Sequence, residues 1–255
     1  MEKHSLIAPE QYNLVSEVEK YSKDESRTAL IWEDEFGAKQ QITYGALIKK
    51  VNKIGTILLE EGLREGDKVL VMIPRLIEAY VIYLATLKIG AVVIPCSEML
   101  RKKDLLYRCS HSEAKAIIAH KPYTSLFTEI NSKETIKSFV INGNEEGWID
   151  LDKRMNHASE ELQLAKTSKD HMAFLSYTSG TTGQPKGVVH THGWAYAHLR
   201  TAASNWLSIG EEDMVWATAG PGWQSGYGVH FYLCLDLEPQ DLFIRGSLKR
   251  KNIYN

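Results

Sequence analysis

The sequence predicts an α/β fold in which parallel or mixed sheets are covered by helices. Between residues 47 and 141, short apolar segments alternate with segments of helical periodicity. The apolar segments are nearly continuous, which is typical of strands buried on both faces of a parallel sheet. Gly62 and Gly90 directly follow two of the helical segments, where glycine commonly ends a helix. These observations together predict a central sheet between two layers of helices.

The composition is that of an ordinary globular protein. The 255 residues, 44% hydrophobic and 24% charged, suffice for one large domain or two small ones. A formal net charge of −2 gives no general attraction to nucleic acid, and we expect none as a partner. No apolar run is long enough to span a membrane. Cys96, Cys109 and Cys234 form no CxxC pair, which predicts reduced, buried thiols and a cytoplasmic location.

The first 60 residues predict a strand pair and one long helix. Residues 1–28 are polar, and we expect them to wrap the surface with a helix near residues 9–22. Residues 29–32 and 40–44 are rich in strand-forming side chains on either side of a turn. Thr43 is suited to cap the helix that follows.

Strands and helices alternate from residue 68 onward. Apolar strands are predicted at 68–73, 91–95, 115–119 and 138–141, with helices at 78–88 and 102–109. Residues 143–170 are charged and irregular, with a helix predicted at 157–165. A helix at 193–207 and a strand at 214–218 complete the predicted elements.

An eleven-residue segment interrupts this alternation, and it has the composition of a phosphate-binding loop. It reads Tyr177-Thr178-Ser179-Gly180-Thr181-Thr182-Gly183-Gln184-Pro185-Lys186-Gly187. Glycine lets the backbone approach a ligand closely, and consecutive backbone N–H groups form a concavity that binds anions. The hydroxyl groups add donors, and a lysine provides a mobile positive charge suited to phosphate. We therefore predict a cradle for a nucleotide triphosphate.

This segment differs from the common P-loop, in which the lysine opens a helix. Here Pro185 precedes Lys186, and a glycine and two valines follow, so we expect the segment to lead into a strand. The alternative interpretation is a surface hairpin rich in Ser, Thr and Gly that binds nothing.

Other candidate residues have simpler explanations. His190 and His192 are two residues apart and could bind a metal, but no third ligand is recognisable. We therefore favour structural roles for both histidines and predict no metal site. Residues 101–103 are all basic, and we expect solvent exposure rather than contact with a phosphate. Residues 220–223 predict a rigid turn at the carboxyl end of a strand, where ligands collect in parallel sheets.

The segment at residues 177–187 resembles the phosphate-binding signature of the AMP-forming adenylating enzymes. These include acyl-CoA synthetases, peptide-synthetase adenylation domains and firefly luciferase. The likeness extends through residues 63–69 and 88–95. Residues 104–119 and the turn at 220–223 most resemble the acetyl- and medium-chain acyl-CoA synthetases. This resemblance covers about residues 25–224 and implies the incomplete amino-terminal domain of an acyl-CoA-synthetase-like fold.

The resemblance implies an acid–CoA ligase that uses ATP, a small-molecule carboxylic acid and CoA. The acid is first converted to an acyl-adenylate and then to an acyl-CoA thioester. The phosphate contacts carried over from the family are Thr178, Ser179, Gly180, Thr181, Thr182, Gly183 and Lys186, with Lys186 and Thr181 in catalytic roles. Gly222 and Trp223 would line the acid-binding pocket. The family also uses Mg²⁺, and we expect its ligands to fall outside this chain.

The resemblance ends at Gln224. The family continues with Lys-Trp and then Ser-Pro-Phe, and this chain does not. If the degenerate codons of residues 225–231 are regrouped one base upstream, they permit Lys-Trp-Val-Trp-Ser-Pro-Phe. We therefore expect residues 225–255 to be an out-of-frame, non-native tail after an amino-terminal portion at 1–224. The alternative for residues 225–255 is a genuine divergent tail. For the function, the alternatives are a carrier-protein ligase and an inactive fragment that binds nucleotide weakly.

Overall fold

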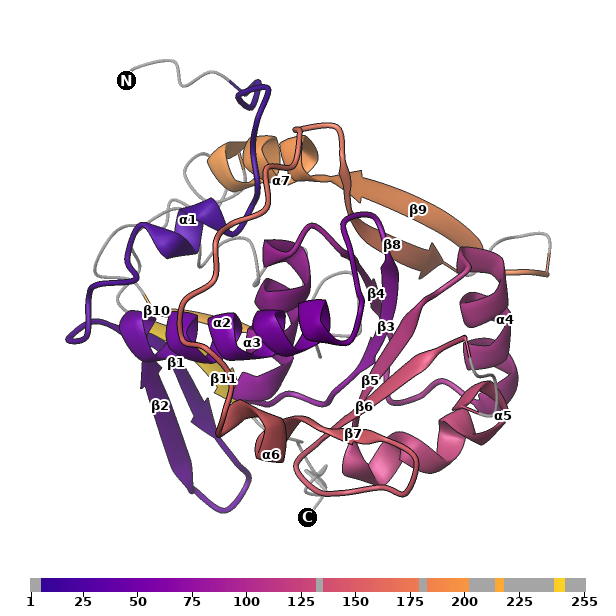
Figure 1. Cartoon of the computed structure of the whole chain (residues 1–255). Coiled ribbons are helices and arrows are strands. Elements are labelled where there is room, and N and C mark those ends of the chain that lie inside the picture. The colour runs from indigo at the N-terminus through magenta and orange to yellow at the C-terminus, as the bar shows by residue number, and fades with distance from the viewer. Residues whose placement is uncertain (1–5, 132–134, 179–182, 202–213, 218–240, 246–255) are drawn as a thin grey trace, which may run out of the picture.

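The computed structural model describes residues 6–131, 135–178, 183–201, 214–217 and 241–245 (Figure 1). For the last two ranges it describes only the course of the backbone. A seven-stranded sheet lies between two layers of helices, and a four-stranded sheet lies beside it. The α/β class expected from the sequence is therefore confirmed.

The larger sheet has the strand order β7-β6-β5-β3-β4-β8-β9. Its strands are β3 (Lys68–Met72), β4 (Val92–Pro95), β5 (Ala116–His120), β6 (Lys137–Ile141), β7 (Ile149–Asp150), β8 (Met172–Thr178) and β9 (Lys186–Thr191). Neighbouring strands are parallel except for β8 and β9, which form an antiparallel hairpin. The four strands predicted between residues 68 and 141 are confirmed, and the short β7 was not predicted.

Each central strand is buried on both faces. Val69 and Val71 pack in the same core cluster as α2 (Tyr44–Glu60) and α3 (Ile77–Lys88). Leu70 packs on the opposite face, in the cluster that includes side chains of α4. The helices of that layer are α4 (Lys102–Ser112), the 3-10 helix η1 (Lys121–Phe127) and α5 (Thr128–Asn131). Burial on both faces explains why these strands are continuously apolar in the sequence.

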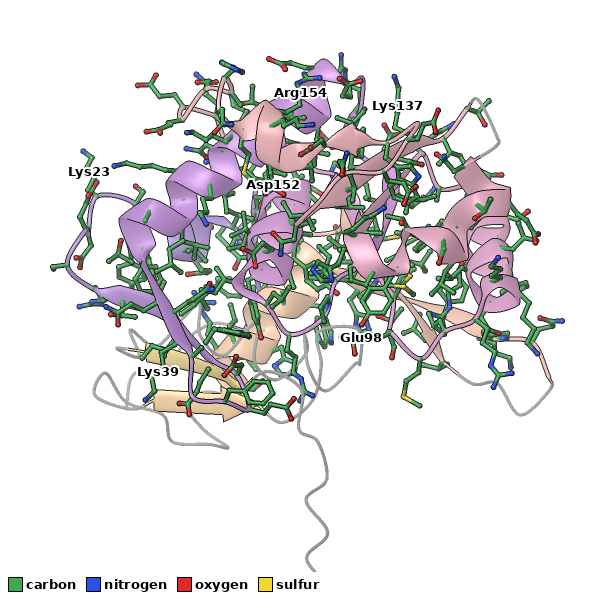
Figure 2. All side chains as sticks on the ribbon, turned by 90° about the horizontal axis from the view of Figure 1, so that it is seen from below. Lys23, Lys39, Glu98, Lys137, Asp152 and Arg154 are labelled. Carbon is green, nitrogen blue, oxygen red and sulfur yellow. The ribbon has the colours of Figure 1, made fainter. Side chains whose placement is uncertain are left out.

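Helix α2 begins as its sequence predicts. The side-chain oxygen of Thr43 accepts a hydrogen bond from the N–H of Ala46 at 3.3 Å, which satisfies one of the free donors at the helix start. Val51 and Leu58 are fully buried in the core cluster that α2 shares with α3. The other end of α2 is exposed, where the guanidinium of Arg154 bonds Glu61 at 2.7 Å and Glu60 at 2.8 Å. Figure 2 shows Arg154 at the surface of the molecule.

The smaller sheet has the order β10-β11-β1-β2. Its strands are β1 (Thr28–Glu33), β2 (Lys39–Thr43), β10 (Met214–Ala217) and β11 (Asp241–Arg245). The antiparallel pairing of β1 and β2 confirms the predicted strand pair, and the predicted strand at 214–218 is confirmed as β10. That β1 also pairs with β11 in parallel was not predicted.

The prediction of a helix at residues 157–165 is wrong. Helix α6 (Leu151–Met155) comes earlier, and the chain after it is irregular. Polar backbone groups of this irregular segment bond to other elements. The carbonyl oxygen of Glu160 accepts from the Asn52 side chain at 2.7 Å, and the N–H of Ala165 donates to the carbonyl oxygen of Lys88 at 2.9 Å. Residues 157–165 therefore form an irregular segment that bonds to α2 and α3 and is not helical.

The expectation for residues 1–28 is also corrected. Helix α1 is short (Ser16–Glu19), although the prediction extended it over residues 9–22. Leu14, Val15 and Val18 are fully buried, so this segment enters the core instead of wrapping the surface. The side-chain amide of Asn13 donates to Leu87 O at 2.9 Å, which ties the segment to the end of α3.

Helix α7 (His192–His198) follows β9 directly, and Thr191 caps it by accepting the N–H of Trp194 at 3.1 Å. The predicted helix at 193–207 is confirmed as far as the description reaches, since residues 202–207 lie outside the described part. Within the described ranges, no helix combines the length and the apolar character needed to cross a membrane.

Candidate active site

The hairpin of β8 and β9 carries the candidate phosphate site. Thr178, the last residue of β8, lies opposite Lys186, the first residue of β9. The loop between them, residues 179–185, therefore closes the hairpin, and we call it the phosphate loop. The expectation that this segment leads into a strand is confirmed. Strand β9 is the last strand in the order of its sheet, as Figure 1 shows.

The structure describes only some of the predicted site residues. Thr178 is half-buried, and Gly183 and Lys186 are exposed. Gly183 has a φ of 96°, in the left-handed region that glycine adopts without strain. Predicted residues that lie outside the described part are Ser179, Gly180, Thr181, Thr182, Gly222 and Trp223. The structure thus brings Thr178 and Lys186 together at the two ends of the phosphate loop.

Helix α4 contacts both sides of the phosphate loop. The phenol of Tyr107 donates a hydrogen bond to the carbonyl oxygen of Pro185 at 3.0 Å. One helical turn later, His111 Nδ1 shares a hydrogen bond of 2.8 Å with the hydroxyl of Tyr177. The rings of Tyr107 and His111 stack with their centroids 5.4 Å apart. The predicted site did not include Tyr107 or His111.

An arginine lies under the same hairpin. The guanidinium carbon of Arg108 is 5.4 Å from the ring centre of Tyr177. Burial raises the pKa of the Tyr177 hydroxyl. Burial also raises the pKa of Cys96 to about 11, and this effect outweighs the nearby Arg108, which lowers it. Both groups are therefore neutral near pH 7, and Arg108 leaves the base of the hairpin with a positive charge.

The base of the hairpin is closely packed. A Cβ atom on Gly187 would lie 3.0 Å from Leu175 Cδ1 and 3.9 Å from His111 Cε1. The first distance is shorter than ordinary van der Waals contact, so glycine allows β9 to lie tightly against β8. The last glycine of the motif thus serves packing, while Gly183 serves the turn.

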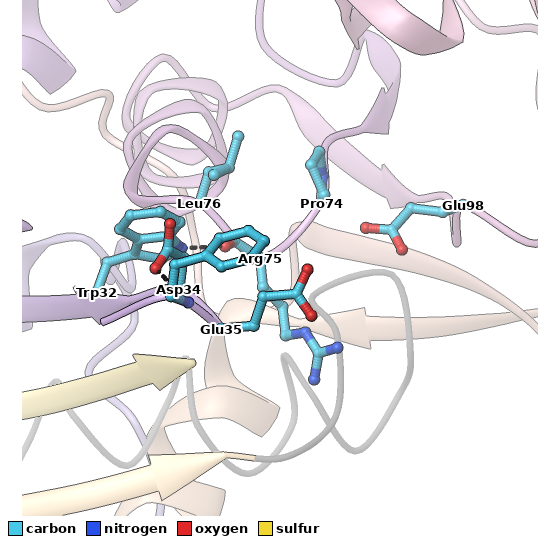
Figure 3. A pocket seen from close by; sticks show the side chains of 8 residues that line it. Trp32, Asp34, Glu35, Pro74, Arg75, Leu76 and Glu98 are labelled. Atoms are coloured by element: carbon cyan, nitrogen blue, oxygen red, sulfur yellow. Dashed lines mark hydrogen bonds between the residues drawn. The ribbon is translucent and has the colours of Figure 1, made fainter. Parts of the chain in front are cut away.

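A second concave site lies at the carboxyl ends of β3 and β4 (Figure 3). It is a pocket of about 230 Å³. Its lining residues are Trp32, Asp34, Glu35, Phe36, Pro74, Arg75, Leu76 and Glu98. The indole N–H of Trp32 donates to Arg75 O at 2.7 Å, which joins β1 to the loop after β3. Burial raises the pKa of Glu98, and the charge of Arg75 opposes that shift. None of its lining residues was among the predicted site residues.

The structural interpretation of His192 is supported, because its buried imidazole accepts the backbone N–H of Leu14 at Nδ1. In the described part of the chain, no three His, Cys, Asp or Glu side chains lie close enough together to hold a metal ion. The described residues thus show no three-ligand set that the family's Mg²⁺ could use. Residues 101–103 are exposed as expected, and Cys96 and Cys109 are buried free thiols. Cys234 lies outside the described residues.

Comparison with known proteins defines the class. The family model described as "AMP-binding enzyme" matches residues 18–237, which include the whole hairpin and phosphate loop. This chain therefore belongs to the AMP-binding enzyme family.

Its relatives within the family are acyl-CoA synthetases. The chain is 52% identical over 224 residues to the "Uncharacterized acyl–CoA ligase YtcI" of Bacillus subtilis, an alignment that covers 88% of this chain and 42% of that protein. It is 32% identical to the human mitochondrial acyl-coenzyme A synthetase ACSM3 over 229 residues, covering 86% of this chain and 39% of the relative. The chain thus spans about four tenths of the length of these two relatives.

Solved structures show the same fold. The anthranilate CoA ligase AuaEII in complex with anthranoyl-AMP superposes with a TM-score of 0.86 at 22% identity, covering 94% of this chain and 46% of that one. The acyl-CoA synthetase of Brucella canis superposes with a TM-score of 0.83 at 23% identity, covering 98% and 46%. The described fold is therefore that of the amino-terminal part of acyl-CoA ligases.

Proposed function

We propose that this chain supplies the phosphate-binding half of an AMP-forming acyl-CoA synthetase. The observation that carries the proposal is the hairpin, in which Thr178 and Lys186 face each other across the ends of a glycine- and hydroxyl-rich loop. In this proposal residues 1–224 are the amino-terminal portion of the adenylation domain, and the location is cytoplasmic. The substrates are ATP, a small-molecule carboxylic acid and CoA.

The reaction has two steps. A carboxylate oxygen attacks the α-phosphorus of ATP, the bond from that phosphorus to the bridging oxygen of the β-phosphate breaks, and pyrophosphate leaves. The thiol sulfur of CoA then attacks the acyl-adenylate carbonyl, the bond to the AMP oxygen breaks, and the thiol proton is lost to solvent. The products are AMP and an acyl-CoA thioester.

The phosphate loop acts on the first step. Negative charge develops on pyrophosphate as it leaves, and donors that are already in place stabilise that charge without reorganisation. Lys186 supplies the mobile cation, and the hydroxyls of Thr178, Ser179, Thr181 and Thr182 supply donors. Gly180 and Gly183 let backbone N–H groups approach the phosphates. Thr181 and Lys186 take the catalytic roles because they contact the departing group.

The remaining assignments follow from the family. Gly222 and Trp223 would line the acid-binding pocket, as the family resemblance implies. The family's Mg²⁺ would screen the phosphate charge, but the described residues offer no ligand set for it. No step is therefore assigned to magnesium on residues of this chain.

Isotope exchange between ATP and pyrophosphate tests the first step, and CoA-thioester formation tests the second. Both assays use a panel of acetate, butyrate, octanoate and benzoate. They compare the 255-residue chain with the product of the same gene read in the alternative frame after Gln224. Exchange without CoA-thioester formation would favour a carrier-protein ligase. The proposal is rejected if neither product exchanges pyrophosphate and neither binds ATP.

A second candidate is a nucleotide binder that does not catalyse the reaction. It is favoured by the phosphate hairpin, the part of the proposed site that the described residues contain. We expect the 255-residue chain to bind pyrophosphate or ATP and to be inactive in exchange. Full exchange activity in the 255-residue chain would exclude this candidate.

A further inference from the structure

The chain contains one asparagine that is followed directly by glycine, at Asn142-Gly143. The pair comes immediately after β6, in the connection of residues 142–148 that leads to β7. Both residues are exposed to solvent. Asparagine is a thermally labile residue, and a following glycine has no side chain to shield its backbone nitrogen. The connection therefore presents a reactive pair to water.

The backbone of this connection accounts for both residue types. Asn142 has a φ of 56°, in the left-handed region where asparagine is enriched over most other residues. Gly143 has a φ of 142°, and a Cβ atom there would lie 2.8 Å from Lys121 Cγ. Any other residue at position 143 would be strained and would have to displace Lys121. The fold thus favours this pair, and the chemical lability of the pair comes with it.

The backbone nitrogen of Gly143 is accessible for reaction. Among the described residues, none accepts a hydrogen bond from its N–H. The electrophile is the side-chain carbonyl carbon of Asn142, the residue directly before it. Ring closure between these two atoms uses only the chain of Asn142 itself, so no other side chain has to take part. The geometry of one exposed turn therefore suffices for the reaction.

We propose that Asn142 is a site of spontaneous deamidation in the folded protein. The nitrogen of Gly143 loses its proton to solvent and bonds to the side-chain carbonyl carbon of Asn142. The bond from that carbon to the amide nitrogen breaks, and ammonia leaves with a proton from solvent. Water then opens the cyclic imide. Opening at the side-chain carbonyl gives aspartate, and opening at the backbone carbonyl gives isoaspartate, in which the main chain runs through the former side chain.

Conversion would act on two attachments of this connection. The carboxylate of Asp152 on α6 (Figure 2) accepts the N–H of Asn142 at 2.7 Å. The carboxylate of Glu145 accepts the ammonium of Lys121 at 2.6 Å and the hydroxyl of Thr124 at 2.5 Å. Aspartate would add a negative charge to the residue that bonds Asp152, and like charges repel. Isoaspartate would lengthen the main chain between the two attachments.

Incubation of the folded 255-residue chain at mildly alkaline pH tests the proposal, which does not depend on the proposed function. The tryptic peptide of residues 138–153 contains both Asn142 and Asn144. Fragmentation by mass spectrometry assigns each change from amide to carboxyl to one of them. Asn144 is the matched control, because it is exposed in the same connection but is followed by Glu145, whose side chain crowds the nitrogen. Enzymatic methylation of isoaspartyl carboxyl groups identifies the isoaspartate.

We expect Asn142 to convert to a mixture of isoaspartate and aspartate while Asn144 remains an amide. Asn142→Gln should abolish conversion at this position, because glutamine has to close a larger and slower-forming ring. A synthetic peptide of residues 138–150 gives the rate without the fold, and urea titration of the same protein sample gives its unfolded fraction. A reaction that needs global unfolding would be slower than in the peptide by about a thousandfold or more, because stable domains are unfolded for no more than that fraction of the time.

Hydrogen exchange measures the structural effect. We expect the amides of residues 142–148 to exchange about fivefold faster after conversion, as the loss of one hydrogen bond would give. Asn142→Asp should show a smaller change, because it adds the charge without lengthening the main chain. The proposal is overturned if the folded protein shows no conversion after the peptide has converted. Conversion in proportion to the unfolded fraction, or equal conversion of Asn142 and Asn144, would also overturn it.

Discussion

The imidazole of His192 accepts a hydrogen bond from the backbone N–H of Leu14 at 3.0 Å, across 178 positions of the chain. His192 is the first residue of α7, and its side chain has no solvent exposure. Since Nδ1 is the acceptor, the proton of the neutral ring is on Nε2. This bond ties the segment before α1 to the end of the phosphate hairpin, and it requires an uncharged ring.

Stability should therefore fall in mild acid. Burial, helped by the electrostatic effect of the neighbouring His171, lowers the pKa of His192 from 6.5 to about 4. Below pH 6.5 the unfolded chain takes up a proton that the folded chain rejects, so stability falls until the folded state also protonates near pH 4. Over this window the loss amounts to about 3 kcal/mol. Urea unfolding at half-unit pH steps measures it.

His192→Asn supplies the test, because an amide oxygen can accept the Leu14 N–H without titrating. We expect the variant to take up about one proton fewer on unfolding in mild acid. Its free energy of unfolding should therefore depend less steeply on pH. The control is His157→Asn, at an exposed position. The assignment fails if the two variants have the same slope as the unsubstituted protein.

Lys88 should be costly to remove. Its side chain is fully buried, and its ammonium bonds the Asn52 side-chain oxygen at 2.7 Å and the carboxylate of Glu19. Lys88→Met would leave a partly buried carboxylate and a buried amide oxygen without this donor. We expect the free energy of unfolding to fall by about 2–4 kcal/mol, measured by urea denaturation.

Lys49→Met provides the comparison. The ammonium of Lys49 bonds Glu25 at 2.6 Å, but both side chains are exposed to solvent. Exposed ion pairs contribute little because water and salt screen them. We expect no measurable loss of stability from Lys49→Met, and an equal loss from both variants would show that burial does not decide the contribution of Lys88.

Loss of a loop hydroxyl should weaken phosphate binding. Thr181→Val and Thr182→Val keep side-chain shape and remove one donor each. A hydrogen bond to a charged phosphate is stronger than a neutral one, so we expect affinity for ATP and pyrophosphate to fall about tenfold in each variant. Calorimetric titration checks this. Thr128→Val on α5, away from the hairpin, should leave both affinities unchanged.

The coding DNA should contain the family pattern in the neighbouring frame. We expect the nucleotides from the codon of Pro221 onward to read Lys-Trp-Val-Trp-Ser-Pro-Phe when shifted by one base after Gln224. Sequencing the gene decides the matter directly. A gene whose neighbouring frame carries no synthetase sequence would show that residues 225–255 are a genuine divergent tail.

Local signals were enough to predict most of the fold. Continuous apolar runs marked β3 to β6 because strands buried on both faces carry mostly apolar side chains. Thr43 marked the start of α2 because a cap acts within three residues. Pro185 and the residues after Lys186 indicated a strand, now seen as β9, because proline and β-branched valines disfavour an immediate helix.

The errors arose where distant partners override local preference. Residues 157–165 carry helix-forming residues, but their backbone bonds to Asn52 and Lys88 hold them extended. The segment around Leu14 is polar overall. Hydrogen bonds from Asn13 to Leu87 and from Leu14 to His192 nevertheless hold it in the core. Neither outcome can be read from a window of neighbouring residues, since the partners lie tens to hundreds of positions away.

The family, the α/β class and the phosphate motif can all be recognised in the amino-acid sequence, because each depends on residue types at short spacing. The side chains that support the motif are visible only in the folded chain. Nothing in the sequence around Tyr107 marks it as part of the site. The fold brings its hydroxyl to Pro185, which lies 78 positions later in the chain. A hydrogen bond acts only at about 3 Å in space, and the chain places no limit on how far apart its partners lie in sequence.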